Sequence, residues 1–370
     1  MGWISVFAGC AAAAVLALAP AAHADLKSYN AAVTKGDFAA ASNEIPSTWA
    51  GLDRSRKDIF VIGREFGWTA MLAGKPVLAR DVVGSLSATS VVDDAPEVTG
   101  VLLAWANFKV SGDAANRSKL FAALRARAQK PQDDLIALRA AQDLFNAEWT
   151  RDDMGSAAEA AGLGHKFAAE LGDDMVDVGY TLRRFEAVAQ FIQKPDRGDF
   201  ASITALADEI EARLGKETNP KMREQLITAL AHTLAWQGVE REVLRLRGRS
   251  VVDAPDPKDR RASAWYPVSG DPSIPVCRIS LDQRGREPDY PDKARSKGLP
   301  GYAIYAFDTG EGGALTSARI LGSAPHESFT KTIDEVLPVW RWRMADGRSE
   351  ASCRRPDKLI VNFVFSFKRR

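Results

Sequence analysis

The chain has 370 residues, of which 46% are hydrophobic and 26% charged, and its formal net charge is +1. This length exceeds that of a typical single domain, so we expect more than one domain. The composition is that of a folded globular protein and excludes a largely disordered chain. The near-neutral charge disfavours nucleic acid as a partner, because nucleic-acid binding depends on a basic surface.

The first residues have the pattern of an export signal. Residues 3–22 are apolar or small, and Ala22-His23-Ala24 is a small-x-small cleavage pattern. We therefore expect residues 1–24 to be a Sec-type signal peptide and the mature protein to be periplasmic. The alternative is an uncleaved segment that anchors the protein in the inner membrane, facing the periplasm, because the apolar run approaches the length of a bilayer span.

Residues 25–249 have a helical pattern, with apolar residues at three- and four-residue spacing. Glycines expected in turns between helices recur along this region. Gly36, Gly74 and Gly112 are spaced 38 residues apart, and Gly198 and Gly238 are spaced 40 residues apart. Glycine there permits the left-handed backbone that ends one helix before the next begins. This period is typical of an α-solenoid and resembles TPR-like (tetratricopeptide-type) repeats, with a non-repetitive helical bundle as the alternative.

The composition changes after the helical region. Residues 250–272 are rich in proline and charge and show no period, which predicts a linker. The last part of the chain, 273–370, is modestly basic, with 17 Lys and Arg against 12 Asp and Glu. Its pattern predicts one amphipathic helix and three strands, over residues 329–339, 302–307, 315–321 and 358–368. The fold class is thus multi-domain: an all-α helical-repeat domain, then a small α+β domain with a three-stranded antiparallel sheet.

Several short motifs in this last domain occur in a recognisable order. A Tyr-Pro opens a short helix, glycines precede the first strand, and a basic-aromatic triplet ends the central helix, as in Pro288-Asp289-Tyr290-Pro291, Gly298, Gly301 and Trp340-Arg341-Trp342. Over residues 285–368 this series resembles the C-terminal domain of TonB-family energy transducers. The resemblance implies a non-enzymatic envelope protein linked to transmembrane transport, whose protein or peptide partner is contributed by an outer-membrane receptor.

The final strand is expected to lie at the edge of the sheet. An edge strand presents unpaired N–H and C=O groups, and an extended peptide can add to it by β-augmentation. The resemblance implies that the segment before Tyr-Pro also contacts the peptide. The predicted partner-binding residues are Glu287, Pro288, Asp289, Tyr290, Pro291, Leu359, Ile360, Val361, Asn362, Phe363, Val364 and Phe365.

Two departures from the family pattern bear on function. Glu287 and Asp289 stand where family members often carry Gln, and carboxylates accept but do not donate hydrogen bonds at neutral pH, so the partner peptide is expected to differ. The upstream region is a helical domain instead of a permanent anchor with a long Pro-rich span. The sequence therefore does not predict proton-motive energy transduction.

The remaining chemistry-bearing residues predict no catalytic site, no cofactor and no metal site. His165, His232 and His326 lack metal-ligand spacing, and the acidic doublets are expected to cap helices. Cys277 and Cys353 are predicted to form a disulfide bond in the oxidising periplasm, with two separate thiols as the alternative. The competing hypothesis for function is a scaffold in which the helical repeats bind the partner and the C-terminal domain caps them or forms a homodimer.

Overall fold

The structure is a computed structural model. It describes residues 26–130, 134–194, 200–247, 262–265, 268, 271–276, 279–282, 286–309, 313–325, 327–344, 354 and 358–366. The chain forms two compact units, Met1–Leu182 and Arg183–Arg370, and the boundary falls inside helix α9 (Val176–Gln193).

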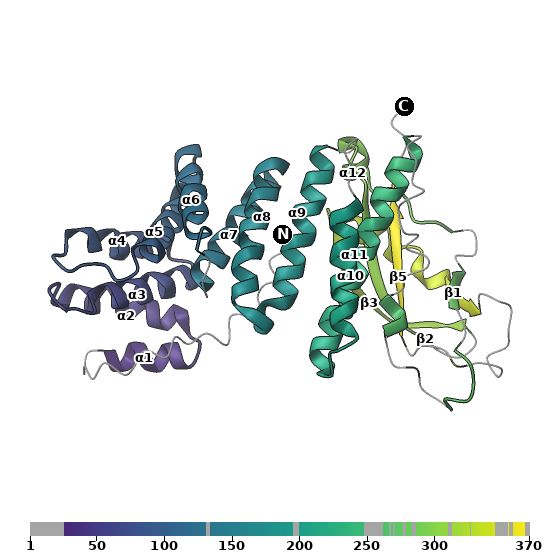
Figure 1. The fold of residues 1–370 in the computed structure, drawn as a ribbon, viewed down its shortest axis with the longest axis horizontal. Helices are drawn as coiled ribbons and strands as arrows, with labels where there is room; N and C mark the ends of the chain where they lie inside the picture. The colour runs from purple at the N-terminus through teal and green to yellow at the C-terminus, as the bar shows by residue number, and fades with distance from the viewer. Residues whose placement is uncertain are drawn as a thin grey trace. The chain divides into compact units, whose positions relative to one another are not determined.

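The first unit is helical throughout its described residues, as the apolar periodicity predicts (Figure 1). Consecutive helices pack against each other and bury one apolar face each. The helices are α1 (Lys27–Thr34), α2 (Phe38–Gly51), α3 (Ile59–Leu72), α4 (Pro76–Ser85), α5 (Pro96–Ser111), α6 (Ala114–Arg127), α7 (Leu135–Thr150) and α8 (Met154–Glu170), with short 3-10 turns η4 (Leu86–Ala88) and η5 (Gly172–Met175).

The glycine pattern is confirmed in the first unit and fails later. Gly36, Gly74 and Gly112 have φ of +71°, +70° and +57°, so each adopts the left-handed conformation expected between two helices. Gly238 lies inside a continuous helix, α11 (Pro220–Leu246), so its prediction as a turn is wrong. Gly198 lies outside the described residues. The helical architecture is confirmed, whereas its assignment to TPR-like repeats stays a prediction.

Acidic residues cap helices in this unit, as predicted. The carboxylates of Asp134 and Asp153 accept hydrogen bonds from the backbone N–H of Ala137 and Ser156, at the starts of α7 and α8. The cap at Asp134 is buried and also accepts a hydrogen bond of 2.7 Å from Arg127 of the preceding helix. These carboxylates stabilise the first turns of α7 and α8.

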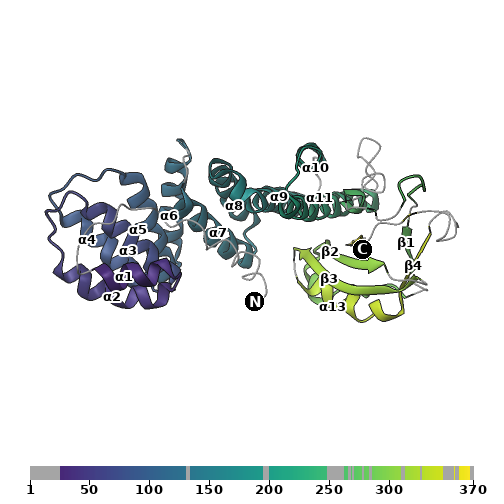
Figure 2. The same cartoon turned by 90° about the horizontal axis from the view of Figure 1, so that it is seen from below.

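The second unit contains three layers (Figure 2). Helices α10 (Phe200–Leu214) and α11 form one outer layer, and a sheet with strand order β3-β2-β5 forms the middle. The other outer layer contains helices α12 (Asp292–Lys297) and α13 (Ser328–Asp334). The strands are β2 (Gly301–Thr309), β3 (Leu315–Ala324) and β5 (Lys358–Phe365). Both β3 and β5 pair antiparallel with β2, which confirms the predicted three-stranded antiparallel sheet.

Strand β2 is the centre of this unit. Its residues from Gly301 to Phe307 are buried without alternation, because both faces of the strand are covered. Tyr305 and Phe307 join the core beneath α13, together with Phe329, Trp340 and Phe363. The alternate residues of β2, such as Tyr302 and Ile304, lie on the other face of the sheet, towards α11. The C-terminal sheet therefore has helices on both sides.

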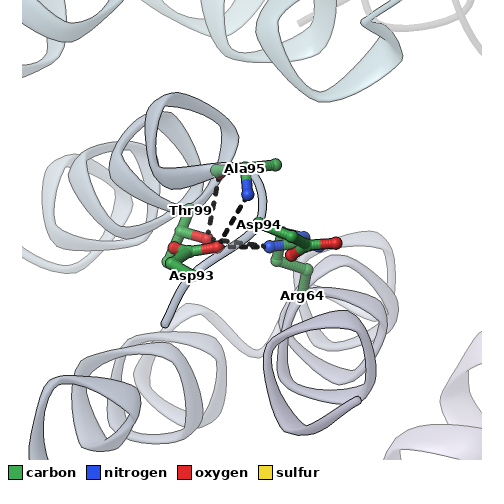
Figure 3. Close-up of polar contacts among 5 residues, drawn as sticks. All are labelled: Arg64, Asp93, Asp94, Ala95 and Thr99. Carbon is green, nitrogen blue, oxygen red and sulfur yellow. Dashed lines mark hydrogen bonds and ion pairs between the residues drawn. The ribbon is translucent and has the colours of Figure 1, made fainter. Parts of the chain in front are cut away.

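One ion-pair cluster in the first unit connects α3 to the loop before α5 (Figure 3). The Arg64 guanidinium donates to the carboxylates of Asp93 (2.8 Å) and Asp94 (2.7 Å). Asp93 also accepts from the backbone N–H of Ala95, where α5 begins. The Arg64 and Asp93 side chains are only 13% and 14% exposed, so solvent screens this pair weakly. The hydrogen bond from Arg64 also lowers the pKa of Asp94.

Replacing Arg64 by Met should lower the free energy of unfolding by about 2 kcal/mol, because the partly buried Asp93 carboxylate then lacks its cation. The Met side chain keeps most of the apolar packing of the Arg64 aliphatic stem. Urea denaturation followed by circular dichroism measures this change. Arg80→Met is the matched control, since Arg80 pairs with its neighbour Asp81 at an exposed position and should change stability by less than about 0.5 kcal/mol. Equal losses in the two variants would contradict the assignment.

Candidate peptide-binding edge of the sheet

Strand β5 lies at the edge of the three-stranded sheet, as predicted. Within the part of the chain that the structure describes, β5 pairs with β2 alone, so the backbone groups on its outer side form no ladder. The pairing runs from Gly301 with Phe365 to Asp308 with Lys358 and contains no register shift. A regular edge of this kind is a template for one more strand.

The opposite edge of the sheet, formed by β3, is irregular. Its pairing with β2 contains two register shifts, and Ser317 has a positive φ of +50°. Its Arg319 is tied by a 3.1 Å ion pair to Glu224 of α11. Bulges, strained residues and charges at an edge oppose strand addition. The two edges thus differ: the pairing of β5 with β2 is regular, whereas the pairing of β3 with β2 is interrupted by register shifts.

The side chains of β5 divide between the two faces of the sheet. Leu359, Phe363 and Phe365 are buried on the α13 side, which is the core face expected from the alternation. On the α11 side, Asn362 is exposed and Val364 is 38% exposed. The buried side chains anchor the strand to the core, whereas Asn362 and Val364 are accessible to solvent on the other face.

The predicted segment before Tyr-Pro lies next to β5. The Trp340 indole donates a 2.7 Å hydrogen bond to the carbonyl of Arg286, and its ring stacks on Phe363 of β5 with centroids 5.0 Å apart. Four residues later, the Tyr290 ring packs edge-on against Phe365 at 5.9 Å. The structure therefore packs Tyr290 of the predicted segment on Phe365 of β5.

Tyr290 is held on both sides. Its hydroxyl donates a 2.6 Å hydrogen bond to the carbonyl of Leu299, and its ring also contacts Phe329. Burial raises the pKa of Tyr290, so the hydroxyl stays a donor at physiological pH. Pro291 is buried, Pro288 is half-buried, and Glu287 and Asp289 are exposed. The segment thus alternates core-facing and solvent-facing residues beside the edge strand.

Sequence reasoning missed a small second sheet near this site. Strands β1 (Ile279–Asp282) and β4 (Arg341–Met344) pair antiparallel, and the buried Trp342 packs with Leu359 of β5. Trp340 and Trp342 are both buried core residues. The alternation of apolar and basic residues from Trp340 to Met344 is the signal that could have indicated this strand.

The face of the sheet opposite α13 is closed by α11. The ring of His232 contacts Tyr302 of β2, and Trp236 lies between Tyr302 and Phe191 of α9. Gly322 of β3 approaches so closely that a Cβ atom there would lie 2.6 Å from the His232 ring. These contacts pack α11 closely against this part of the face.

The hydrogen bonds of His232 identify its tautomer. Its Nε2 lies 3.2 Å from the carbonyl of Leu321, which can only accept, so Nε2 carries the proton. Its Nδ1 must then accept from the Tyr302 hydroxyl, 2.9 Å away. Burial, and then the nearby Arg184 guanidinium, hold the pKa of His232 well below its ordinary value. The ring is neutral, and no pattern in the sequence indicated this structural role.

A short turn of the predicted linker also lies in this region. The 3-10 turn η7 (Ala262–Trp265) contacts α11 and β5, and the Arg223 guanidinium donates to the carbonyl of Trp265 at 3.4 Å. Among the described residues η7 forms no backbone hydrogen bond with β5. Within these described residues η7 therefore contacts β5 without adding a strand to the sheet. The assignment of residues 250–272 as a linker stays a prediction.

Other predicted features have the following outcomes. Cys277 and Cys353 lie outside the described residues, so their disulfide stays a prediction; each is the sequence neighbour of a residue in the backbone bridge between Val276 and Arg354. In the described part of the chain, no His, Cys, Asp and Glu side chains gather as a metal-binding group would require. Across the same residues, every helix is too short or too polar to span a bilayer.

One domain contains the ordered motifs, the edge strand and the Tyr-Pro segment. Residues 286–365 match the family of Gram-negative bacterial TonB protein C-terminal domains. The protein TonB of Yersinia enterocolitica is 29% identical over 97 residues, which are 24% of this chain and 38% of that relative. No solved structure is significantly similar to the chain. The predicted TonB-like domain is confirmed, and the helical region upstream lies outside the family match.

The stability of the TonB-like domain should decrease in acid because of His232. Above about pH 6.5 the histidine is neutral in the folded and unfolded chains, and its contribution is complete. As the pH falls below that value the unfolded chain binds a proton that the folded protein excludes, so the free energy of unfolding should fall by up to about 1.4 kcal/mol per pH unit until the lowered pKa is reached.

Urea unfolding between pH 8 and pH 5 measures this slope. In His232→Gln the part of the slope that begins near about pH 6.5 should disappear, although the variant is less stable at every pH. Tyr302→Phe is the control: it removes the donor to Nδ1 and should cost about 1 kcal/mol while the pH slope persists. An unchanged slope in His232→Gln would show that other groups cause the acid sensitivity.

Proposed function

We propose that this chain is a periplasmic protein linked to envelope transport, which captures an extended peptide of a partner along the outer edge of β5. The observation that supports this most directly is the regular edge of β5, which pairs with β2 alone among the residues that the structure describes and lies beside Tyr290, within a domain that matches the TonB C-terminal family. The partner class that fits the family is an outer-membrane transporter with an extended terminal segment.

The physical basis is β-augmentation. The incoming backbone satisfies N–H and C=O groups that β5 otherwise presents to water, and each such hydrogen bond contributes about 1 kcal/mol net. The core face of β5 is anchored by Phe363 and Phe365, so the strand is already ordered before the peptide arrives. Pre-ordering lowers the entropic cost of binding, because only the peptide must lose conformational freedom.

Helix α11 supports the same function from the other face. It contacts all three strands of the sheet, and its residues from Leu226 to Leu244 are largely buried. A bound peptide would therefore extend a sheet that is already covered by helices on both faces. We propose that the helical region provides a second docking surface, and that the protein acts as an adaptor and not as an energy transducer.

The expected signature of β-augmentation is dependence on alternate backbone amides. The probe is a fluorescein-labelled peptide of alternating Val and Thr, about seven residues long, which is close to an ordinary strand length. N-methylation of three residues whose N–H groups bond to β5 should weaken binding about hundredfold, whereas the same modification on the intervening residues should have little effect. Fluorescence anisotropy with the mature protein measures both affinities.

Hydrogen exchange read by mass spectrometry locates the bound peptide. The probe should slow exchange of backbone amides in residues 358–365 and leave those of β3 unchanged. Equal weakening by both sets of N-methyl groups, or protection confined to the helical region, would contradict the proposal and favour the scaffold hypothesis. Sedimentation velocity accompanies these measurements, because a second copy of β5 pairing at the same edge would produce a homodimer and compete with the peptide.

A further inference from the structure

Arg184 of α9 is a buried cation without a counter-ion. It is only 4% exposed, and it forms no hydrogen bond or ion pair with any residue that the structure describes. A guanidinium has five N–H donors and stays charged, so burying it without acceptors is strongly unfavourable. We propose that Arg184 is the binding site for the carboxylate group of a small molecule, which supplies the missing acceptors. This site does not depend on peptide binding at the β5 edge.

The surroundings of the guanidinium are aromatic and uncharged. The Cζ atom of Arg184 lies 5.3 Å from the centre of the Phe185 ring, a cation–π contact that attracts the charge but provides no acceptor for the N–H groups. The Tyr302 hydroxyl is already committed to Nδ1 of His232, 2.9 Å away. Burial raises the pKa of Tyr302 and lowers that of His232, and the charge of Arg184 lowers both. The site therefore contains one unbalanced positive charge.

Two acidic residues beside this part of α9 have other partners. Glu209 of α10 forms an ion pair with Arg183, the sequence neighbour of Arg184. Glu186 accepts a hydrogen bond of 3.3 Å from Gln190 of the same helix. Burial lowers the pKa of Arg184, and no carboxylate is among the groups that act on it. Of these two adjacent arginines, one is therefore paired within the protein and the other is not.

The accessible part of Arg184 is the end of its guanidinium. Its Nε is sealed from solvent without a partner. The two Nη nitrogens also have no hydrogen bond with a described residue, but they are not sealed in this way, so the guanidinium meets solvent at its Nη end. An exposure of 4% admits a group of a few atoms and excludes a second folded surface. The ligand is therefore a small molecule.

Charge and shape together favour a carboxylate. The planar guanidinium donates two parallel hydrogen bonds to an oxyanion, a geometry that two carboxylate oxygens match. A single carboxylate carries one negative charge and neutralises Arg184. Phosphate carries more than one charge at neutral pH and would leave a buried negative excess beside Phe185 and Tyr302.

An NMR titration of the mature protein at neutral pH tests the site. The probe is sodium acetate, which replaces sodium chloride at constant ionic strength, because chloride cannot accept as two separate oxygens do. The Nε–H resonance of Arg184 should shift and saturate. The ring resonances of His232 should move with it, because the bound anion offsets the charge of Arg184. Inorganic phosphate, added in the same way, should bind at least about tenfold more weakly.

Variants assign the binding to Arg184. In Arg184→Met the His232 resonances should no longer respond to acetate. Arg184→Lys keeps the charge but loses the planar pair of donors, so its affinity for acetate should fall about tenfold. Arg183→Met is the matched control, because Arg183 is already paired with Glu209, and its affinity should stay within about twofold of the wild-type value.

Urea unfolding separates a binding role from a structural one. In chloride, Arg184→Met should have a midpoint at least as high as that of the wild type, because an apolar side chain replaces an unpaired buried charge. Acetate should raise the midpoint of the wild type and not that of Arg184→Met, since a ligand stabilises the state that binds it.

Three outcomes would overturn the proposal. Equal, unsaturated shifts in acetate and chloride would show that water alone solvates the guanidinium. A large fall in the midpoint of Arg184→Met, without an acetate effect in the wild type, would assign a purely structural role. Acetate binding that persists unchanged in Arg184→Met would place the carboxylate elsewhere. If Arg184→Met does not fold, undiminished acetate binding by Arg184→Lys contradicts the proposal and weakened binding supports it.

Discussion

The burial of strand β2 on both of its faces is the constraint that organises the C-terminal half of this protein. Tyr305 and Phe307 require cover from α13, whereas Tyr302 and Ile304 require cover from α11. With both faces closed, the backbone edges are where another strand can join. One of these edges is made irregular by bulges in β3, whereas β5 pairs with β2 in a continuous register, and for this reason we propose the β5 edge as the place where a partner strand adds.

Much of this arrangement could be predicted from local pattern. The alternation in residues 358–368, the turn glycines Gly36, Gly74 and Gly112, and the caps at Asp134 and Asp153 are consequences of short-range stereochemistry. The Tyr-Pro segment and the Trp-Arg-Trp triplet also identified the TonB-like domain. The residues proposed to contact the partner were named from the sequence and their role stays a prediction, while the packing of Tyr290 on Phe365 is known from the structure alone.

The features that sequence reasoning missed depend on contacts between distant segments. Gly238 resembled a turn glycine, yet α11 continues through it, because burial against α10 and the sheet stabilises the helix beyond its local propensity. His232 carried no motif, and its neutral tautomer is determined by Leu321 and Tyr302, which lie far along the chain. The β1–β4 pair is likewise short and joins segments that are widely separated in sequence.

Because α11 covers one face of the sheet, the TonB-like domain cannot be separated from this helix without exposing apolar residues. A fragment cut at residue 273 would retain every family motif but would expose Tyr302 and Ile304 to water, along with the strand ends that His232 now touches. Apolar sheet surface exposed in this way promotes self-association. A cassette for gene fusion or domain recombination therefore has to carry residues 183–370, so the inherited module is larger than its recognisable signature.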